Sequence, residues 1–262
     1  MAFCNLVVST GFNDIDRMLG GLKRGQTYLL GSRQGMGKTT FALNVVNYLA
    51  LHEKRTVVYF AAAEKSDKIV RQLIMNTGKF NTKEMEMFEA SKSDDRRFCE
   101  AKEKVAEANV FIDDTPGISV DKILETCTSV NKLIDLIVVD YLQLVVQMDQ
   151  ATGQHYSESR ICKILSDIAH KFNCPVLILS QISKDCELRE NHHPIMKDLT
   201  DSMIAETVDN IFFLFRDDYY DDDSAYLNIA EFYVAKEEYT SMDDSACLAR
   251  LPECCVFCSI YR

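Results

Sequence analysis

The strongest chemical signal in the chain is a glycine-rich turn, GSRQGMGKTT at residues 31–40, which follows an apolar run, QTYLL, typical of a strand. Such turns aim backbone N–H groups at phosphates, and the helix behind them adds its positive dipole end. Lys38 would reach the β- and γ-phosphates of a nucleoside triphosphate, and the Thr39 hydroxyl would bind Mg²⁺. The usual first glycine is displaced by one place, to Gly31. We predict that the phosphates are held by Ser32, Arg33, Gln34, Gly35, Met36, Gly37, Lys38, Thr39 and Thr40.

A second candidate group is an acid that ends a buried strand. The run LIVVD closes on Asp140, about a hundred residues beyond Lys38. A carboxylate at the carboxyl end of a neighbouring strand is placed to bind Mg²⁺ or its water shell. Asp135 precedes the same strand and fits this role less well. We predict that Thr39 and Asp140 form the metal site.

Hydrolysis also needs a group that orients or deprotonates the attacking water. Glu64 follows the apolar run 55–63, and Gln181 closes the run PVLILS. Both would lie at the carboxyl edge of the sheet, where open α/β sheets bind ligands. Each has a plainer interpretation: Glu64 as part of a polar turn before a helix, and Gln181 as a turn or cap residue.

Apolar runs alternate with helical patterns, and this alternation must position those groups. Continuous apolar runs predict strands covered on both faces, at 26–31, 55–63, 109–113, 133–140 and 175–180. Helical spacing predicts helices at 38–52, 66–76, 82–107, 119–132 (with Ser119 as N-cap) and 156–172. Runs at 210–215, 230–235 and 254–261 are expected to be antiparallel strands. We predict one α/β domain over 1–262, with a mostly parallel central sheet and helices on both faces.

Composition narrows the classes of protein. The 29 basic and 40 acidic residues give a net charge of −11, which argues against a protein coated in nucleic acid but not against a local contact. No apolar run approaches a membrane span, and the N-terminus lacks the features of a signal peptide. Ten scattered cysteines suit reduced thiols in the cytoplasm. Cys255 and Cys258 form a lone CxxC without further ligands at zinc spacing, so we expect buried thiols there.

Together these residues resemble the C-terminal motor domain of DnaB-type replicative DNA helicases, a branch of the RecA-like P-loop ATPases. The resemblance is carried, in family order, by STGFNDIDRMLGGLKRGQ, GSRQGMGKTTFALN, FIDDTPGISV, LIVVDYLQLV, CPVLILSQIS and FLFRDDYY. It implies that Glu64 is the catalytic base, Gln181 a sensor of the γ-phosphate, and Asp140 the second metal-site acid. It also implies ATP hydrolysis coupled to translocation on single-stranded DNA, in a ring, usually a hexamer, with each ATP site at a subunit boundary.

The chain departs from the family pattern where a basic finger should reach the neighbour's phosphates. After the strand 230–235 the family has lysine, any residue, then arginine. This chain keeps Lys236, which we count among the nucleotide-binding residues, but has Glu238 at the arginine position. Residues 217–244 hold ten acids and one base, a net charge of −9, so the surroundings are acidic too.

The loop expected to follow DNA also departs from the pattern. Residues 145–159 contain no Lys or Arg, and only His155, Tyr156 and the following Arg160 offer contacts. The alternative source is the Lys184–Lys197 segment, with Arg189, His192 and His193. The family's separate N-terminal domain is expected to be absent, because the chain begins almost at the motor segment.

Three functions follow. The first is an ATP-dependent helicase motor. The second is a DnaB-like ATP-binding interaction module that hydrolyses ATP poorly and does not unwind DNA, as Glu238 suggests. The third is another RecA-like ATPase, such as a recombinase, which the DYLQL and DDTPG motifs disfavour.

Overall fold

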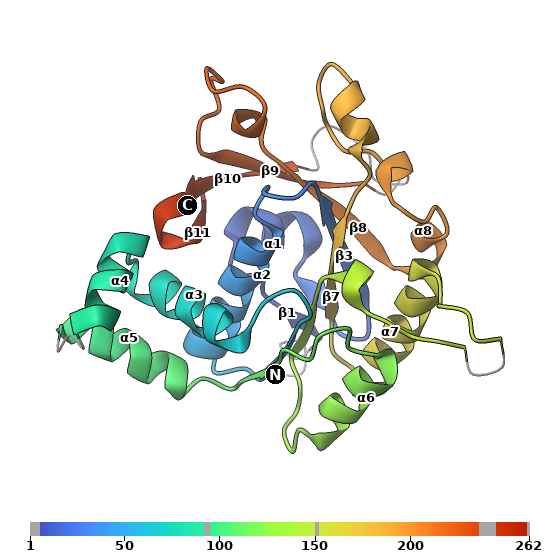
Figure 1. The fold of residues 1–262 in the computed structure, drawn as a ribbon, viewed down its shortest axis with the longest axis horizontal. Coiled ribbons are helices and arrows are strands. Elements are labelled where there is room, and N and C mark those ends of the chain that lie inside the picture. Colours follow the sequence, from blue (N-terminus) through green and yellow to red (C-terminus); the bar gives the residue numbers. More distant parts are fainter. Residues whose placement is uncertain (1–5, 92–94, 150–151, 236–244, 261–262) are drawn as a thin grey trace.

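A nine-stranded sheet forms the centre of the molecule, in the order β11-β10-β9-β8-β3-β7-β6-β4-β5 (Figure 1). The computed structural model describes residues 6–91, 95–149, 152–235 and 245–260. The strands are β3 (Thr27–Ser32), β4 (Val57–Ala61), β5 (Val110–Asp113), β6 (Leu136–Asp140), β7 (Val176–Gln181), β8 (Asn210–Phe215), β9 (Ile229–Val234), β10 (Ser245–Leu251) and β11 (Val256–Ser259). A separate pair is formed by β1 (Val7–Val8) and β2 (Leu22–Lys23).

Helices cover both faces of the sheet (Figure 1). They are α1 (Asn13–Leu19), α2 (Lys38–Asn47), α3 (Ser66–Gly78), α4 (Thr82–Ser91), α5 (Arg96–Ala106), α6 (Val120–Ser129), α7 (Glu158–Phe172) and α8 (Ile204–Thr207). A π-helical turn, η1 (Tyr48–His52), extends α2. Short 3₁₀ turns are η2 (Leu142–Leu144), η3 (Lys184–Leu188), η4 (Met196–Asp198), η5 (Asp217–Tyr219) and η7 (Pro252–Cys254).

The core divides into two layers because successive side chains of a strand point to opposite faces. Tyr59 of β4 packs with α1, α2 and α3 on one face, whereas its neighbours Val58 and Phe60 pack with α6, α7 and α8 on the other. A smaller cluster joins α3, α4 and α5 around Phe80, Phe88 and Phe98. The parallel strands are thus buried on both sides, which explains their continuous apolar sequences.

The predicted α/β class and mostly parallel sheet are confirmed. Ser119 is the N-cap of α6, because its side chain accepts a hydrogen bond from the backbone N–H of Lys122. The helical stretch expected over 82–107, with short breaks, forms two helices, α4 and α5.

The expectation of antiparallel pairing for 210–215 was confirmed on one side of the strand only. This strand, β8, runs parallel to β3 and antiparallel only to β9. The prediction also missed β10, which pairs with β9 and β11. Cys255 and Cys258 are half-buried rather than buried, because β11 lies at the edge of the sheet. Among the described residues, no helix is both long and apolar enough to cross a membrane.

Candidate nucleotide site

The phosphate loop joins the central strand β3 to α2, and glycine is required at two of its turns. Gly35 and Gly37 have φ of 84° and 108°, in the left-handed region that favours glycine. A Cβ at Gly37 would lie 2.8 Å from the ring of Phe257, and one at Gly35 would lie 3.0 Å from the ring of Tyr219. Both the backbone conformation and the packing therefore require glycine at these two positions. The absence of side chains there lets the N–H groups of the loop approach a ligand.

Lys38 begins α2 and folds back over the loop. Its Nζ donates to the carbonyl and hydroxyl oxygens of Ser32 at 2.8 and 3.0 Å, and to the carbonyl of Arg33 at 3.2 Å. The side chain is buried, and burial lowers the pKa of Lys38 to about 8 despite the nearby charge of Asp140. The Lys38 side chain therefore stays protonated at neutral pH, and its ammonium group is surrounded by the oxygens of Ser32 and Arg33.

Asp140, at the end of β6, forms a buried oxygen cluster with Thr39 and Tyr59. Its Oδ2 accepts hydrogen bonds from the Thr39 hydroxyl at 2.8 Å and from the Tyr59 hydroxyl at 2.6 Å. Burial raises the pKa of Asp140, while those two hydrogen bonds act to lower it. The two groups predicted to share a metal are thus in direct contact, 101 residues apart in sequence.

Glu64 and Gln181 lie at the same edge of the sheet. Ser32 pairs with Gln181 across β3 and β7, and Ala61 pairs with Asp140 across β4 and β6. The Glu64 carboxylate accepts from Lys68 Nζ at 2.7 Å, one turn along in α3, and its charge contributes to the raised pKa of Asp140. The register and the electrostatics therefore bring all four predicted groups to one edge.

Gln143 ties two of these strand ends together. Its Oε1 accepts from the backbone N–H of Gln181 at 3.0 Å, and its Nε2 donates to Ser180 Oγ at 3.0 Å and Glu158 Oε2 at 2.9 Å. The sequence reasoning did not single out Gln143 or Tyr59. Gln143 lies in the quoted DYLQL run three residues after Asp140, so its position was a usable signal. Tyr59 lies inside an apolar strand and gave none.

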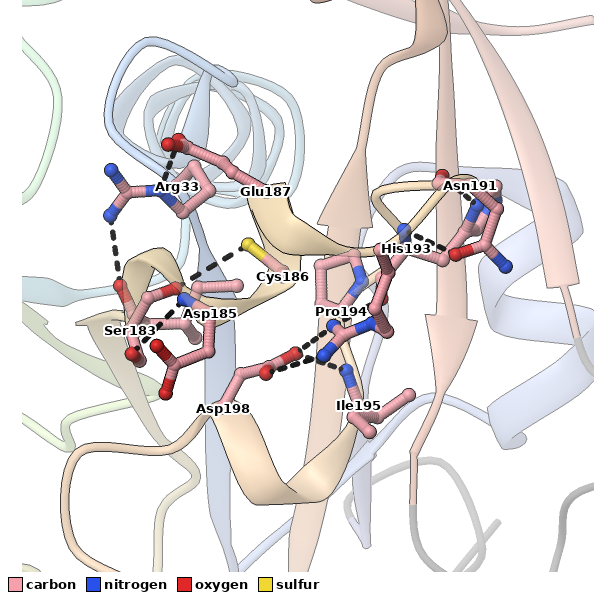
Figure 2. Close-up of polar contacts among 12 residues, drawn as sticks. Arg33, Ser183, Asp185, Cys186, Glu187, Asn191, His193, Pro194, Ile195 and Asp198 are labelled. Carbon is pink, nitrogen blue, oxygen red and sulfur yellow. Dashed lines mark hydrogen bonds and ion pairs between the residues drawn. The ribbon is translucent and has the colours of Figure 1, made fainter.

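Two arginines connect the phosphate loop to neighbouring segments. Arg216, at the end of β8, donates from Nη1 to the carbonyl of Gly35 at 3.1 Å and from Nε to Asp218 at 2.9 Å. Arg33 points away from the loop toward Glu187, with Nε donating to Oε1 at 2.8 Å (Figure 2). Gln34 and Gly35 are exposed, whereas the Met36 side chain is buried and offers only its backbone.

Other predicted groups lie elsewhere. Asp135 binds Arg24, Arg55 and the backbone N–H of Thr56 at the opposite end of β6, which makes it structural. Lys236 and Glu238 fall outside the described residues, so the predicted finger position is not placed.

The arginines and two of the histidines considered for DNA contact are engaged internally, whereas the two lysines are exposed. Arg160 pairs with Asp149 at 3.1 Å and lies 3.6 Å above the Tyr156 ring. Arg189 pairs with Asp198, and His193 bonds Glu231 at 3.1 Å. His192 stacks on Tyr220. Lys184 and Lys197 are exposed.

Comparisons with known proteins identify similar sequences. The chain is 31% identical over 234 residues to the replicative DNA helicase DnaC of Bacillus subtilis (strain 168), and 32% identical over 234 residues to the replicative DNA helicase DnaB of Geobacillus stearothermophilus. Each alignment covers 88% of this chain and 52% of the relative, so the chain spans about half the length of these proteins.

Solved structures of similar fold include two that are 28% identical to this chain. One solved ATPase domain superposes with a TM-score of 0.88 at 28% identity, covering 99% of this chain and 93% of that one. A DnaB-like replicative helicase, studied with its interactions with primase, gives 0.85 at 28% identity and covers 98% and 63%. The RadB recombinase, at 0.57 and 16% identity over 92% of this chain and 95% of that one, shares the fold. The model of the DnaB-like helicase C-terminal domain family matches residues 7–248, and the chain belongs to this family.

Proposed function

We propose that this chain is an ATP-binding and ATP-hydrolysing motor domain that works in a ring, most simply a homohexamer, on single-stranded DNA. The observation that carries the proposal is the meeting of the phosphate loop, the Thr39–Asp140 pair and Glu64 at one edge of the sheet, in a member of the DnaB-like family. Open α/β sheets bind their ligands at this edge.

Phosphate recognition falls to Lys38 and the loop backbone. Within the part of the chain that the structure describes, the Lys38 ammonium bonds oxygens of Ser32 and Arg33 alone, and phosphate oxygens are stronger acceptors for the same donors. The first N–H groups of α2 and its dipole add to this attraction. Membership of the DnaB-like family makes ATP the proposed nucleotide, with its β- and γ-phosphates against Lys38.

Mg²⁺ suits the Thr39–Asp140 pair, because both supply oxygen ligands and the Asp140 carboxylate takes its side-chain hydrogen bonds from the hydroxyls of Thr39 and Tyr59. When bound, the ion neutralises charge on the transferring phosphoryl group. The pKa of Asp140 is raised, so protons compete with the metal more strongly as the pH falls.

Glu64 is proposed as the general base and Gln181 as the group that senses the γ-phosphate. Lys68 holds the Glu64 carboxylate by an i,i+4 ion pair with 2.6 Å between Nζ and Oε2. Gln181 is fixed through its backbone by Gln143, which leaves its side chain amide for a ligand. Lys236 is proposed to reach the phosphates of a neighbouring subunit.

A second function is to be tested beside the first, because Glu238 stands at the arginine-finger position and Arg160, Arg189 and His193 are engaged with acids of this chain. In that case the domain binds ATP and uses it to gate a protein interaction, with little turnover and no unwinding. An arginine finger contributes about 10³–10⁵-fold in rate, so its loss is enough to separate binding from hydrolysis.

The deciding experiment measures ATP turnover with and without single-stranded DNA, together with the state of assembly. Turnover stimulated by DNA in a hexamer supports the motor and excludes the interaction module. A monomer that binds ATP, ignores DNA and turns over negligibly excludes the motor. The variant Glu238→Arg sharpens the test: turnover should rise if residue 238 faces a neighbour's phosphates, and unchanged turnover would show that the finger lies elsewhere.

A further inference from the structure

The backbone of Arg33 forms part of the phosphate loop, whereas its side chain contacts a different segment of the chain. Its carbonyl accepts from Lys38 Nζ at 3.2 Å and from the Ser32 hydroxyl at 3.0 Å. Its guanidinium donates to Glu187 Oε1 at 2.8 Å and to the carbonyl of Ile182 at 3.0 Å (Figure 2). The Arg33 side chain is 14% exposed and that of Glu187 is 35% exposed, so the pair is partly shielded from solvent.

The segment that receives Arg33, residues 183–198, is braced internally as one unit, which we call the brace segment. Arg189 holds the buried Asp198 through two nitrogens and also donates to the carbonyl of His193 at 2.6 Å. The backbone N–H of Ile195 donates to Asp198 Oδ2 at 2.8 Å, and that of Ser183 donates to the Asp198 carbonyl at 2.7 Å. The two ends of the segment, Ser183 and Asp198, are therefore hydrogen-bonded to each other, and this closes the segment into a braced loop.

The far side of the brace segment is attached to β9. His193 Nε2 lies 3.1 Å from Glu231 Oε2, and the Tyr233 hydroxyl donates to the carbonyl of Pro194 at 2.7 Å. The His193 ring also packs against Phe215, with ring centroids 3.9 Å apart. The strand ends at Val234, two residues before Lys236, the residue proposed to reach a neighbour.

We propose that Arg33 and Glu187 are positioning residues that couple phosphate binding in the loop to the brace segment and, through it, to β9. The inference rests on the proposed function. A phosphate that takes Lys38 away from the Arg33 carbonyl changes the contacts of the loop at the residue whose side chain is fixed to Glu187. The shift passes to the brace segment, because an ion pair with a second hydrogen bond to Ile182 holds the two together.

The test measures hydrogen–deuterium exchange of the backbone amides in residues 184–199, with and without Mg²⁺-ATP. ATP affinity is measured in parallel by titration. In the wild type, ATP should slow or speed this exchange at least threefold. Glu187→Gln and Arg33→Gln should each abolish most of that response, and the double variant should add nothing further, because both remove the same interaction. Glu187→Gln is isosteric and should keep ATP affinity within about threefold, since it touches no group that faces the phosphates.

Arg71→Gln is the matched control, since Arg71 and Glu89 form a comparable ion pair at 3.1 Å between α3 and α4, remote from the loop. It should leave the ATP response of 184–199 unchanged. Coupling is refuted if Glu187→Gln keeps the wild-type response, if the two Gln variants are additive, or if the control loses the response equally. ATP that binds the wild type without altering this exchange refutes the coupling alone, whereas failure of ATP to bind refutes the proposed function and the coupling with it.

Discussion

Tyr59→Phe removes one hydroxyl from the buried cluster around Asp140, and its cost should depend on pH. The hydroxyl donates at 2.6 Å to the carboxylate, and both side chains are almost fully buried, at 0% and 3% exposure. A hydrogen bond to a charged group contributes about 1.5–3 kcal/mol. No water can replace it at so buried a position, so we expect the free energy of unfolding to fall by about 2 kcal/mol at pH 8.

The pH dependence follows from the charge of Asp140. Burial raises the pKa of this carboxyl, and the Tyr59 hydrogen bond opposes that rise, so the variant raises the pKa further. A carboxyl with a raised folded-state pKa stabilises the folded protein at low pH, and this stability is lost as the pH rises through that pKa. The deficit of Tyr59→Phe is therefore full where Asp140 is ionised and shrinks as the pH falls through the Asp140 pKa.

The assay is urea unfolding without nucleotide, at pH 8 and at the lowest pH where the wild type stays folded. Tyr28→Phe is the matched control. Tyr28 is 2% exposed, accepts from the backbone N–H of Lys23 at 2.6 Å and donates to Gln26 Oε1 at 3.1 Å, so its partners are neutral. Its deficit should not change with pH. Equal deficits for Tyr59→Phe at both pH values would refute the assignment of Asp140 as a buried carboxylate held by this hydroxyl.

Three further variants probe the site and its support, and a fourth, Lys163→Gln, is a control. Lys38→Ala should weaken ATP binding by at least about tenfold, the equivalent of one charge-assisted hydrogen bond, in calorimetric titration; unchanged affinity and turnover would contradict the phosphate-loop assignment. Glu64→Gln should keep ATP affinity while steady-state turnover falls by about 10²–10⁴-fold, whereas full turnover would place the base elsewhere. Arg189→Gln should cost about 3 kcal/mol in urea unfolding, since it leaves the buried Asp198 charge unpaired. Lys163→Gln, at the exposed Lys163–Asp167 pair, should lower the free energy of unfolding by less than about 1 kcal/mol. Equal losses for Arg189→Gln and Lys163→Gln would contradict a stabilising role for the Arg189–Asp198 pair in the brace segment.

The sequence was most informative where apolar runs and turn residues act locally. Strands β3, β4, β6 and β7 were predicted because buried parallel strands are continuously apolar. The missed parallel pairing of Asn210–Phe215 with β3 was avoidable, since NIFFLF is as apolar as those strands and belongs in the same setting. The missed strand β10 was not avoidable in this way. It buries only Ala246 and Leu248, and Arg250 interrupts it, so its apolar signal is weak.

Long-range polar pairs could not be predicted from one sequence. Arg33 and Glu187 are 154 residues apart, and Tyr59 and Asp140 are 81 apart. Nothing in the local pattern around Glu187 or Tyr59 marks either as a partner, because each contact is created by strand register and loop path. By contrast, the Thr39–Asp140 contact followed from two motifs that each had a mechanism.

The distribution of charge around the loop separates ATP binding from ATP hydrolysis. Arg33 is neutralised by Glu187 and Arg216 by Asp218, so among the cations described at the loop only Lys38 bonds uncharged oxygens alone. Lys38 and the loop backbone are sufficient to bind phosphates. Charge that develops on the transferring phosphoryl group needs a further cation, which contributes about 4–7 kcal/mol when it is an arginine finger. Under the proposed function, that cation would come from Lys236 of a neighbouring subunit or from a different partner, and the rate of hydrolysis would then depend on assembly.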